Sequence, residues 1–583
     1  MAEYRLLAGT PAELQFASEK DIEEFVTGLE KYERGEVTAD VFRGFRLNRG
    51  VYGQRQTDVN MIRVKIPQGV ITAEALIACA DTADQYSRGF GHITTRQNIQ
   101  LHFVKLTEAP KALERLAQAG LTTKEACGNT VRTVVACPHA GLLPEEPFDV
   151  TPYGQALTRY FLRNPICQNL PRKFKVTFSS CKEDCVKGAI NDIGAYARIK
   201  DGVAGFRLVA GGGLSTQPMA ALLVEDFCPA DELLSASEAL VRLFDREGNR
   251  QNKAKARLKY VRKKYGDPKF LEMYREERAK IRAEGREKQP IEAPAAVTPF
   301  LAPKLVAAVA NFDSAGFNAF QTTNIKAQRQ DGFHLVTVRL RLGDITSAQL
   351  RALAQICETY GEGAVRATVD QNLTLRFIPT QNLVPLYYAL CEVGLAEAGA
   401  GTIGDVTSCP GAETCNLAVT ASRQLALTIS EKLAQNPSSA QHAAQHLEIK
   451  ISGCPNSCGQ HHIAGIGFHG GLKKVGARPA PIYQLHLGGI IREGAAVFGR
   501  ELVKIPARRV PDAVLRLVAL YEKERNPDEK ANEFFARVEA DKVKTLLADL
   551  TAMEDGSMTE GDFSDLGEEA PFRAEVGEGE CAA

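Results

Sequence analysis

The chain has 583 residues, of which 44% are hydrophobic and 24% charged, so it is long enough to form several domains with large cores. No apolar run approaches the length of a membrane-spanning helix, and the N-terminus, Met1-Ala-Glu-Tyr-Arg, lacks the apolar stretch of a signal peptide. We therefore expect a soluble cytoplasmic protein whose thiols are reduced and available to bind metal.

The formal net charge is zero, but the charges are unevenly spread. Residues 551–583 contain ten acidic side chains and one Arg, whereas the first 550 residues carry 70 basic and 61 acidic side chains. A basic body suits an anionic substrate or an acidic electron donor, although an ordinary solvated surface explains most of these charges. The tail has low hydrophobicity and is predicted to be disordered. Nothing in the sequence is typical of a nucleic-acid-binding module.

The N-terminal segment begins with one amphipathic run, Ser18 to Tyr32, which predicts a helix. An Arg-rich stretch from Arg43 to Gln56 leads into a predicted strand, Met61 to Pro67. A predicted helix, Thr72 to Ser87, follows the strand. None of these elements carries a recognisable catalytic motif.

The next predicted strand has an unusually polar face. Alternation places Arg96, Asn98, Gln100 and His102 on the same side of it. Because burying four polar side chains without partners is costly, this face predicts a polar partner such as a cofactor with several carboxylates. A helix from Pro110 to Ala119 completes a β-α-β-type unit.

Two lysines farther along the chain form a candidate anion site. Lys173 and Lys175 are two residues apart on a predicted strand, so their ammonium groups point the same way. Like charges repel unless an anion lies between them, and Arg132 would be a third cation if the fold brings it there. By contrast, Gly211-Gly-Gly213 alone is weak evidence for a phosphate site, and no dinucleotide-binding fingerprint is present.

The second half of the chain repeats the first. Residues 246–300 predict helices followed by an extended, Pro-containing linker. Beyond it, Gly361 to Phe377 mirrors Gly91 to Phe103, and Ser408-Cys409-Pro410 mirrors Ala136-Cys137-Pro138. An internal repeat of this size implies a pseudo-two-fold arrangement with a ligand between the halves.

Two cysteine pairs about forty residues apart are the strongest chemical signal: Cys409 with Cys415, and Cys454 with Cys458. A predicted helix, Asn416 to Ala434, would direct its amides toward the first pair, and a predicted strand, Leu447 to Ser452, leads to the second. Four Cys can hold an iron–sulfur cluster. Zinc sites usually use C-x2-C pairs, and the spacings here are C-x5-C and C-x3-C. A zinc site and buried structural thiols remain alternatives, whereas a disulfide is disfavoured.

The first half keeps part of this cysteine pattern. Cys137, Cys181 and Cys185 match Cys409, Cys454 and Cys458, whereas the position of Cys415 falls near Leu143, which cannot bind metal. A second cluster would need Cys167 or another donor, so relic or buried thiols are the favoured interpretation. Near the C-terminus, Cys581 is expected to be only an exposed thiol.

The motifs T-S-C-P-G-x-x-x-C and G-C-P-N-S-C-G resemble those of the sirohaem- and 4Fe–4S-containing sulfite/nitrite reductase haemoproteins. The resemblance runs from about Arg43 to about Ala540 and is closest to the ferredoxin-dependent sulfite reductase type. It implies an α+β fold of two pseudo-symmetric halves, each a ferredoxin-like α/β unit plus a sirohaem-binding α/β domain, with the cofactors between the halves. The implied domains are an N-terminal arm (1–50), a first ferredoxin-like half-domain (51–120), a first sirohaem-binding domain with the substrate cations (121–245), a helical linker (246–300), a second ferredoxin-like half-domain (301–395), a second domain for sirohaem and the 4Fe–4S cluster (396–545) and the acidic tail (546–583).

The resemblance also implies roles for individual residues. The cluster ligands would be Cys409, Cys415, Cys454 and Cys458, with Cys458 bridging to the sirohaem iron. The sirohaem carboxylates would be held by Thr94, Arg96 and Gln100, whereas His92 stands where family members often carry Arg. The substrate cations would be Arg63, Arg132, Lys173 and Lys175. Tyr52 and Cys127 match a pair that lies beside the substrate and is covalently joined in some members.

The implied activity is the six-electron reduction of sulfite to sulfide, with electrons from ferredoxin or a similar small donor. A flavoprotein partner subunit is the alternative donor, and we expect a monomer. The Lys-x-Lys pattern at Lys173 and Lys175 resembles sulfite reductases, because nitrite reductases tend to carry Asn at the second position. Reduction of nitrite to ammonia is the close alternative. A non-catalytic sirohaem- or cluster-binding protein is a distant one, since a carrier needs no substrate cations.

Overall fold

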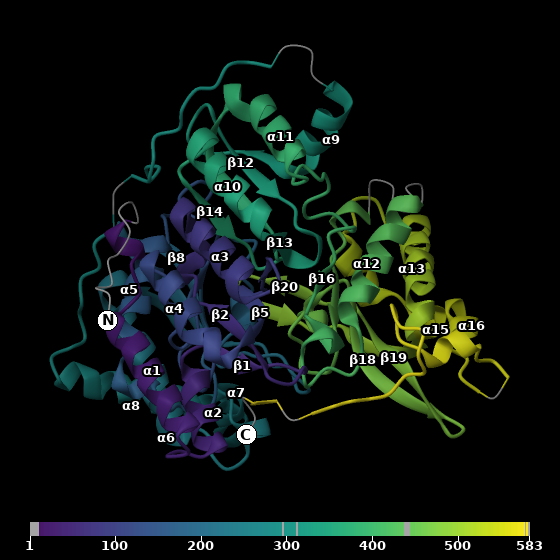
Figure 1. Ribbon diagram of the computed structural model, residues 1–583, viewed down its shortest axis with the longest axis horizontal. Coiled ribbons are helices and arrows are strands. Elements are labelled where there is room, and N and C mark those ends of the chain that lie inside the picture. Colours follow the sequence, from purple (N-terminus) through teal and green to yellow (C-terminus); the bar gives the residue numbers. More distant parts are fainter. Residues whose placement is uncertain are drawn as a thin grey trace.

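In the part of the chain that the structure describes, the fold consists of four five-stranded sheets, one two-stranded sheet and the helices that cover them (Figure 1). The structure is a computed structural model that describes residues 11–293, 296–309, 313–436, 444–554, 556–577 and 579–580. Cys581 lies outside the described residues. Among the described helices, none combines the length and the apolar character needed to cross a membrane.

The N-terminal arm is helical, and its first helix follows the predicted amphipathic run from Ser18 to Tyr32. Helix α1 (Glu19–Glu33) and helix α2 (Ala39–Asn48) pack through Phe25, Leu29 and Phe42 onto the first ferredoxin-like sheet. The Tyr32 and Phe42 rings stack with their centroids 4.4 Å apart. Burial of these aromatic side chains fixes the arm on the body.

The two ferredoxin-like sheets exchange one strand each. In order, the first sheet contains β1 (Val51–Gly53), β2 (Val59–Val64), β5 (Ile99–Lys105), β4 (Phe90–Ile93) and β13 (Asp344–Thr346). The second contains β11 (Ile325–Ala327), β12 (Phe333–Val338), β15 (Leu373–Pro379), β14 (Ala364–Ala367) and β3 (Val70–Thr72). Strand β13 comes from the second half and pairs with β4, whereas β3 comes from the first half and pairs with β14.

Helices α3 (Ala73–Tyr86) and α10 (Ser347–Tyr360) each follow an exchanged strand and pack against each other. Their apolar faces join the two sheets into one continuous hydrophobic core, which helices α4 (Ala109–Gln118) and α11 (Leu383–Glu392) also help to form. The two ferredoxin-like units are therefore one structural body.

The other two sheets belong to the predicted cofactor domains. The first contains β10 (Leu222–Pro229), β9 (Val203–Ala210), β8 (Ile193–Lys200), β7 (Val176–Ser179) and β6 (Val135–Ala136). The second contains β16 (Thr407–Ser408), β17 (Ile449–Ser452), β18 (Ile466–Val475), β19 (Arg478–Leu487) and β22 (Arg500–Pro506). Helices cover one side of each sheet: α5 (Thr151–Phe161) and α6 (Leu233–Glu247) on the first, α12 (Ser422–Gln435) and α13 (Val510–Glu524) on the second.

The register of the strands defines which residues of the two cofactor domains are equivalent. Val176 pairs with Ile193 in parallel register, and Ile449 pairs with Ile466 in the same way. The residue that precedes each strand is Lys175 in the first domain and Glu448 in the second. The repeat seen in the sequence is therefore also a repeat of the fold.

A hairpin and a helical segment connect the halves. The hairpin of β20 (Ile490–Arg492) and β21 (Ala495–Val497) extends from the second half, and its Glu493 forms ion pairs with Arg198 and Arg207 of the first half. The predicted linker contains helices α7 (Leu258–Tyr265) and α8 (Asp267–Ala283), followed by an extended stretch before α9 (Ser314–Asn324).

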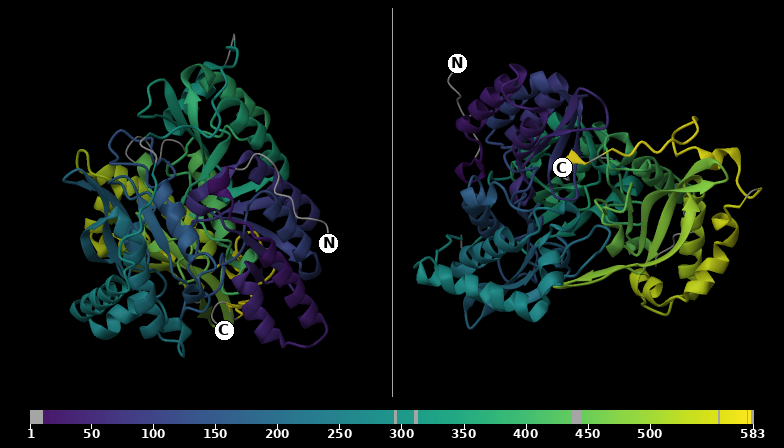
Figure 2. Two further views of the ribbon diagram at one scale, coloured as in Figure 1. Left: turned by 90° about the vertical axis from the view of Figure 1, so that its left-hand side faces the viewer. Right: turned by 90° about the horizontal axis from the view of Figure 1, so that it is seen from below.

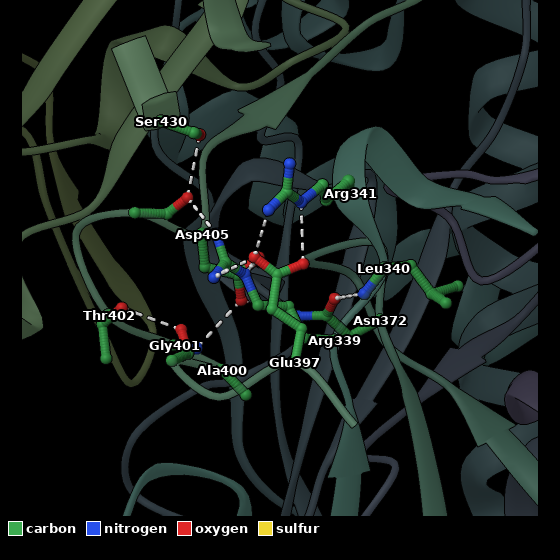
Figure 3. A network of polar contacts seen from close by, with 12 residues as sticks. Arg339, Leu340, Arg341, Asn372, Glu397, Ala400, Gly401, Thr402, Asp405 and Ser430 are labelled. Atoms are coloured by element: carbon green, nitrogen blue, oxygen red, sulfur yellow. Dashed lines mark hydrogen bonds and ion pairs between the residues drawn. The ribbon is translucent and has the colours of Figure 1, made fainter. Parts of the chain in front are cut away.

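A buried polar network fixes the second ferredoxin-like unit to the second cofactor domain (Figure 3). The Arg339 guanidinium lies 3.1 Å from a Glu397 oxygen and 3.7 Å from an Asp405 oxygen. Asn372 donates to Asp405 Oδ2 at 2.7 Å and accepts from the Leu340 amide at 2.9 Å. Burial raises the pKa of Asp405, while Arg339 acts in the opposite direction, so the carboxyl is held by charge and hydrogen bonds together.

The polar strand differs from its prediction. The strand β5 begins only at Ile99, and Thr94 to Asn98 form a turn in which Gln97 has φ of 57°. The Thr94 hydroxyl accepts from the Arg96 and Asn98 amides, both at 3.2 Å, and so stabilises this turn. Arg96 therefore leaves the sheet and does not share one face with the residues of β5, because the alternation breaks at the left-handed residue.

The acidic tail is ordered where the structure describes it, contrary to the predicted disorder. Helices α14 (Ala531–Arg537), α15 (Ala540–Leu546) and α16 (Ala548–Thr551) lead into it. Asp562 forms an ion pair with Arg509 at 2.6 Å, and Phe563 and Phe572 are buried. The tail then returns to the first half, as Figures 1 and 2 show, where Glu580 accepts from the Arg46 guanidinium and the Gly53 amide. Amino-acid composition alone predicts disorder in the tail, because it does not show that the carboxylates of the tail pair with basic side chains on the rest of the protein.

Candidate functional site

The four predicted cluster cysteines lie on two loops that leave neighbouring parallel strands. Cys409 follows β16 and Cys454 follows β17, and these strands pair in register at Thr407 and Lys450. Parallel strands end at the same edge of a sheet, so the two loops meet there.

The four cysteines lie within electrostatic range of one another. Burial, together with the charges of Cys458 and Cys409, raises the pKa of Cys415 to about 11. Burial likewise raises the pKa of Cys454, and the other three cysteines add to this effect. Cys458 is exposed, whereas Cys409 is buried. Burial also raises the pKa of Cys409, so thiolates at Cys409, Cys415 and Cys454 need a cationic partner, which a metal cluster provides.

The helix beside the first pair begins later than predicted. Helix α12 starts at Ser422 and not at Asn416, because the Val419 and Thr420 amides donate to the Gly453 carbonyl at 2.8 and 3.2 Å. A Cβ atom at Gly453 would lie 2.7 Å from the Thr420 oxygen, so glycine is required for this approach. This long-range contact forms a turn where the sequence predicts helix.

Hydrogen-bond donors converge on Cys409. The Gly453 amide donates to its Sγ at 3.2 Å, and the Ser422 hydroxyl lies 3.4 Å from the same atom. Donors of this kind stabilise a thiolate and adjust the reduction potential of an iron–sulfur cluster. The helix α12 therefore contributes through the hydroxyl of its first residue.

The predicted substrate cations gather next to the cysteine loops. Lys173 and Lys175 are half-buried and alternate with the buried Phe174 and Val176, so both ammonium groups lie on the same side. Burial lowers the pKa of Lys175 well below its usual value, and Arg96, Arg257 and Lys173 lower it further.

The charge of Cys458 acts on Lys175 in the opposite direction. Lys175 of the first half and Cys458 of the second half are therefore close enough to interact electrostatically. In addition, the Thr95 hydroxyl donates to the Cys458 carbonyl at 3.1 Å and ties the turn of the first half to the cysteine loop. The site is thus composite, with cations from one half and thiols from the other.

Arg96 forms the base of the cation group. Its guanidinium donates to Asn191 Oδ1 at 3.0 Å and to the Thr133 carbonyl at 2.6 Å. Burial, together with the charges of Arg132, Arg257 and Arg63, lowers its pKa to about 9, although Asp192 acts in the opposite direction. The mutual repulsion of these side chains favours binding of an anion with several negative charges.

Arg257 is a member of this group that the sequence did not reveal. It forms an ion pair with the buried Asp192 at 2.6 Å, and Asp192 also accepts from the Lys175 amide at 2.8 Å. Arg257 belongs to a basic stretch interpreted as linker, so no local signal distinguished it from solvated charge. Proximity to Lys175 could be recognised only from the fold.

The remaining predicted residues have the following surroundings. Gln100 Nε2 lies 3.4 Å from Met61 Sδ, and Arg63 Nε is buried without a hydrogen-bond partner within the described chain. Arg132 donates to the Gly128 and Ala126 carbonyls, both at 3.0 Å, and so holds the loop that carries the buried Cys127.

Tyr52 and His92 belong to the first ferredoxin-like sheet. Tyr52 lies on β1 opposite Met61, and its predicted link to Cys127 stays a prediction. His92, whose sirohaem contact the sequence left unassigned, lies 3.0 Å from Asp344 of the exchanged strand. It also contacts Gln371. It therefore belongs to the interface between the halves.

Two domain families match the chain, each of them twice. The family described as "Nitrite and sulphite reductase 4Fe-4S domain" matches residues 127–282 and 399–552. The family described as "Nitrite/Sulfite reductase ferredoxin-like half domain" matches residues 52–119 and 326–393. The two pairs of matched regions follow the two halves of the fold.

Some individual proteins with similar sequences are named as nitrite reductases and others as sulfite reductases. A ferredoxin–nitrite reductase of Synechococcus elongatus is 30% identical over 465 residues, which cover 79% of this chain and 85% of that protein. A ferredoxin sulfite reductase of Mycobacterium tuberculosis is 29% identical over 491 residues, which cover 83% of each. The solved structure of the Mycobacterium tuberculosis NirA protein superimposes with a TM-score of 0.74 at 27% identity, covering 90% of this chain and 97% of that one.

Proposed function

Because the chain belongs to the family of nitrite and sulphite reductases that bind sirohaem and a 4Fe–4S cluster, we propose that it reduces sulfite to sulfide with electrons from ferredoxin. The chain is an oxidoreductase on the same grounds. The preference for sulfite over nitrite and the identity of the donor are part of the proposal, since relatives of comparable similarity carry either name.

The residues of the site fit both cofactors. Cys409, Cys415, Cys454 and Cys458 would hold the cluster, and Cys458 would share its thiolate with the sirohaem iron. Thr94, Arg96 and Gln100 would contact the sirohaem carboxylates. When bound, the coupled pair would supply single electrons and a metal ion to which the substrate atom can bind.

The side chains of the protein bind the substrate and deliver protons. The guanidinium groups of Arg63 and Arg132 would hold the oxygen atoms of the anion. Lys173 and Lys175 would neutralise its charge and donate protons, since each oxygen that leaves as water requires two. A proton is released more easily from Lys175 than from an ordinary lysine, because its pKa is lowered by burial and by Arg96.

The Lys175 environment is the observation that carries the choice of sulfite. Sulfite is partly a dianion near neutral pH, whereas nitrite has a single charge. A group of cations that includes both Lys173 and Lys175 compensates a dianion better than a monoanion. We expect some nitrite activity as well, because the same cations attract either anion.

The test is turnover of anaerobically purified enzyme on both anions. A visible spectrum with iron and sulfide analysis first establishes that both cofactors are present. We expect sulfide from sulfite with reduced ferredoxin or a reduced viologen dye, and a higher kcat/KM for sulfite than for nitrite. Ammonia from nitrite without sulfide from sulfite would favour the nitrite reductase alternative. Full cofactor content with no turnover would indicate a non-catalytic binding protein.

The Tyr52–Cys127 pair is a further part of the proposal. A phenol beside the substrate could orient the anion or deliver a proton, and a thioether bond between a ring carbon and the Cys127 sulfur would fix its rotamer. Formation of this bond removes two hydrogens and so requires an oxidant such as oxygen. Peptide mass analysis should show the two peptides joined with a loss of two hydrogens, and two unmodified peptides would disprove the link.

The oligomeric state is proposed to be a monomer. The two halves of one chain already supply both the cations and the thiols, so a second copy is not needed to complete the site. Light scattering of the purified protein at enzyme concentrations used in assays would test this directly.

A further inference from the structure

Three cysteines of the first half come together away from the proposed active site. Cys137 follows β6, and Cys181 and Cys185 lie on the loop after β7. Their Sγ atoms all lie within 4.8 Å of one another, and those of Cys137 and Cys185 are 3.1 Å apart. All three are free thiols.

The three thiols stand at the positions equivalent to three of the cluster cysteines. Cys181 lies five residues after Val176, as Cys454 does after Ile449, and these two residues are equivalent in strand register. Cys185 packs beside Val369 of the second half. The equivalent Cys458 accepts a hydrogen bond at its carbonyl from Thr95 of the first half, which stands at the position equivalent to Val369. The chain therefore builds the same pair of loops twice.

The separation of the sulfurs distinguishes the two sites. Among the described residues, three cysteines within 4.8 Å of one another occur in the first half, whereas the four cysteines of the second half are spaced more widely. A zinc–sulfur bond of about 2.3 Å places the ligands of a tetrahedral ion about 3.8 Å apart. The spacing in the first half therefore suits one ion, and a four-iron cluster needs more room.

The place of the fourth cluster ligand explains the difference. Leu143 stands where the second half has Cys415, and the neighbouring Leu142 is buried against Leu335 and Phe377. Apolar packing fills the volume that a cluster would need on that side. With the fourth thiol missing, the three remaining sulfurs approach one another.

The surroundings can balance the charge of bound thiolates. Burial lowers the pKa of the Arg366 guanidinium to about 10, while the Cys137 thiol acts in the opposite direction, so the two lie within electrostatic reach. Cys181 and Cys185 are only half-buried, so an ion can reach the site.

We propose that Cys137, Cys181 and Cys185 bind a single thiophilic d10 ion, Zn2+ or Cu+, and that this mononuclear site replaces a second iron–sulfur cluster. Soft thiolate ligands favour both ions over magnesium or calcium. Binding displaces the thiol protons and changes no oxidation state. The proposal does not depend on whether sulfite or nitrite is the substrate.

The experiment begins with metal analysis of the holoenzyme. Zinc, copper, iron and acid-labile sulfide are measured per chain after anaerobic purification. We expect close to one equivalent of zinc or copper, with iron and sulfide accounting for one cluster and one sirohaem. The analysis itself distinguishes the two ions. Cobalt added to zinc-free holoenzyme should give a thiolate-to-cobalt charge-transfer band in the near ultraviolet.

Variants then locate the ion. Cys181→Ser is expected to lose the extra equivalent and the cobalt band while its sirohaem spectrum stays unchanged. Cys228→Ser is the matched control, because Cys228 is a buried free thiol of the same half outside the three-cysteine group. If Cys181→Ser fails to fold, Cys185→Ser and the wild-type stoichiometry decide the question.

Three results would overturn the proposal. Iron and sulfide sufficient for a second cluster would show that the site is not mononuclear. A Cys137–Cys185 disulfide in peptides alkylated without reduction would show a redox pair in its place. A holoenzyme with an intact sirohaem spectrum and neither zinc, copper nor a cobalt band would show that the thiols bind no ion.

Discussion

The two halves of the molecule carry opposite charges at equivalent positions. Before the central strand, the first half has Lys175 and the second has Glu448. In the turn before the polar strand, Arg96 of the first half corresponds to Asp370 of the second. One fold therefore presents a cationic surface in one copy and an acidic surface in the other.

The acidic surface is neutralised within the protein. Lys187 lies 3.3 Å from Glu448, and Lys450 lies 2.8 Å from Asp370. In the first half, by contrast, Lys175 is surrounded by further cations, namely Arg96, Arg257 and Lys173. The comparison teaches that the repeated fold by itself does not make a substrate site. The site arises where like charges gather and an external anion can stabilise them.

The largest effect is expected from the equivalent cysteines Cys458 and Cys185. Cys458→Ser should lower turnover by more than about 100-fold, because loss of a direct ligand exceeds the 10–100-fold cost of changing an outer-shell residue. The electronic coupling between cluster and haem should disappear in Mössbauer or EPR spectra. Cys185→Ser is the control and should keep the coupling. Full coupling in Cys458→Ser would rule out the bridging role.

The next comparison exchanges charge at Lys175 and Glu448. Lys175→Asn should lower sulfite turnover by about 100-fold, as expected for removal of a general acid, and nitrite turnover by less. Glu448→Gln, at the equivalent position, should leave both rates within about twofold, as expected for a change outside the site. Steady-state kinetics on both anions provide the measurement. Equal losses on sulfite and nitrite for Lys175→Asn would contradict the selectivity argument.

The pH dependence of turnover tests the same lysine. A lysine donates a proton only in its charged form, so turnover should fall as pH rises through its pKa, which lies well below the usual value of 10.5. On the alkaline side of the profile, turnover should fall by about tenfold for each pH unit. Nitrite is the substrate to use, since sulfite itself titrates near neutral pH. Lys175→Arg should remove this alkaline limb, and an unchanged profile would show that another group donates.

The smallest effect is expected where the second half neutralises itself. Asp370→Asn leaves the buried Lys450 ammonium without its closest carboxylate, so the free energy of unfolding should fall by about 1–2 kcal/mol. Turnover should stay unchanged. Urea denaturation of the holoenzyme, followed by far-UV circular dichroism, measures the loss. A drop in activity without a drop in stability would place Asp370 in the active site.

Features fixed by nearby residues were predictable from the sequence. The four cysteines were recognised by their spacing and motif, and helices such as α3 (Ala73–Tyr86) follow from their periodicity. The family and the two-half fold followed from the same motifs.

Features that depend on distant contacts were not predictable. The late start of α12 depends on Gly453, which is far from Ser422 in sequence. Arg257, which immediately precedes α7, joins the cations because it forms an ion pair with Asp192. The tail is ordered only because Arg509 and Arg46 meet its carboxylates. Each of these is an interaction between segments that carry no signal when considered alone.

The exchanged strands β3 and β13 have a consequence for dividing the protein. A chain cut within the linker would yield two fragments, each lacking one strand of its own sheet. The N-terminal fragment would have no partner for β4, and the C-terminal fragment would have no partner for β14. An unpaired edge is a template for aggregation, so either fragment produced alone should be insoluble. Produced together, the fragments should complement each other in the manner of a domain-swapped dimer, because each carries the strand that the other lacks.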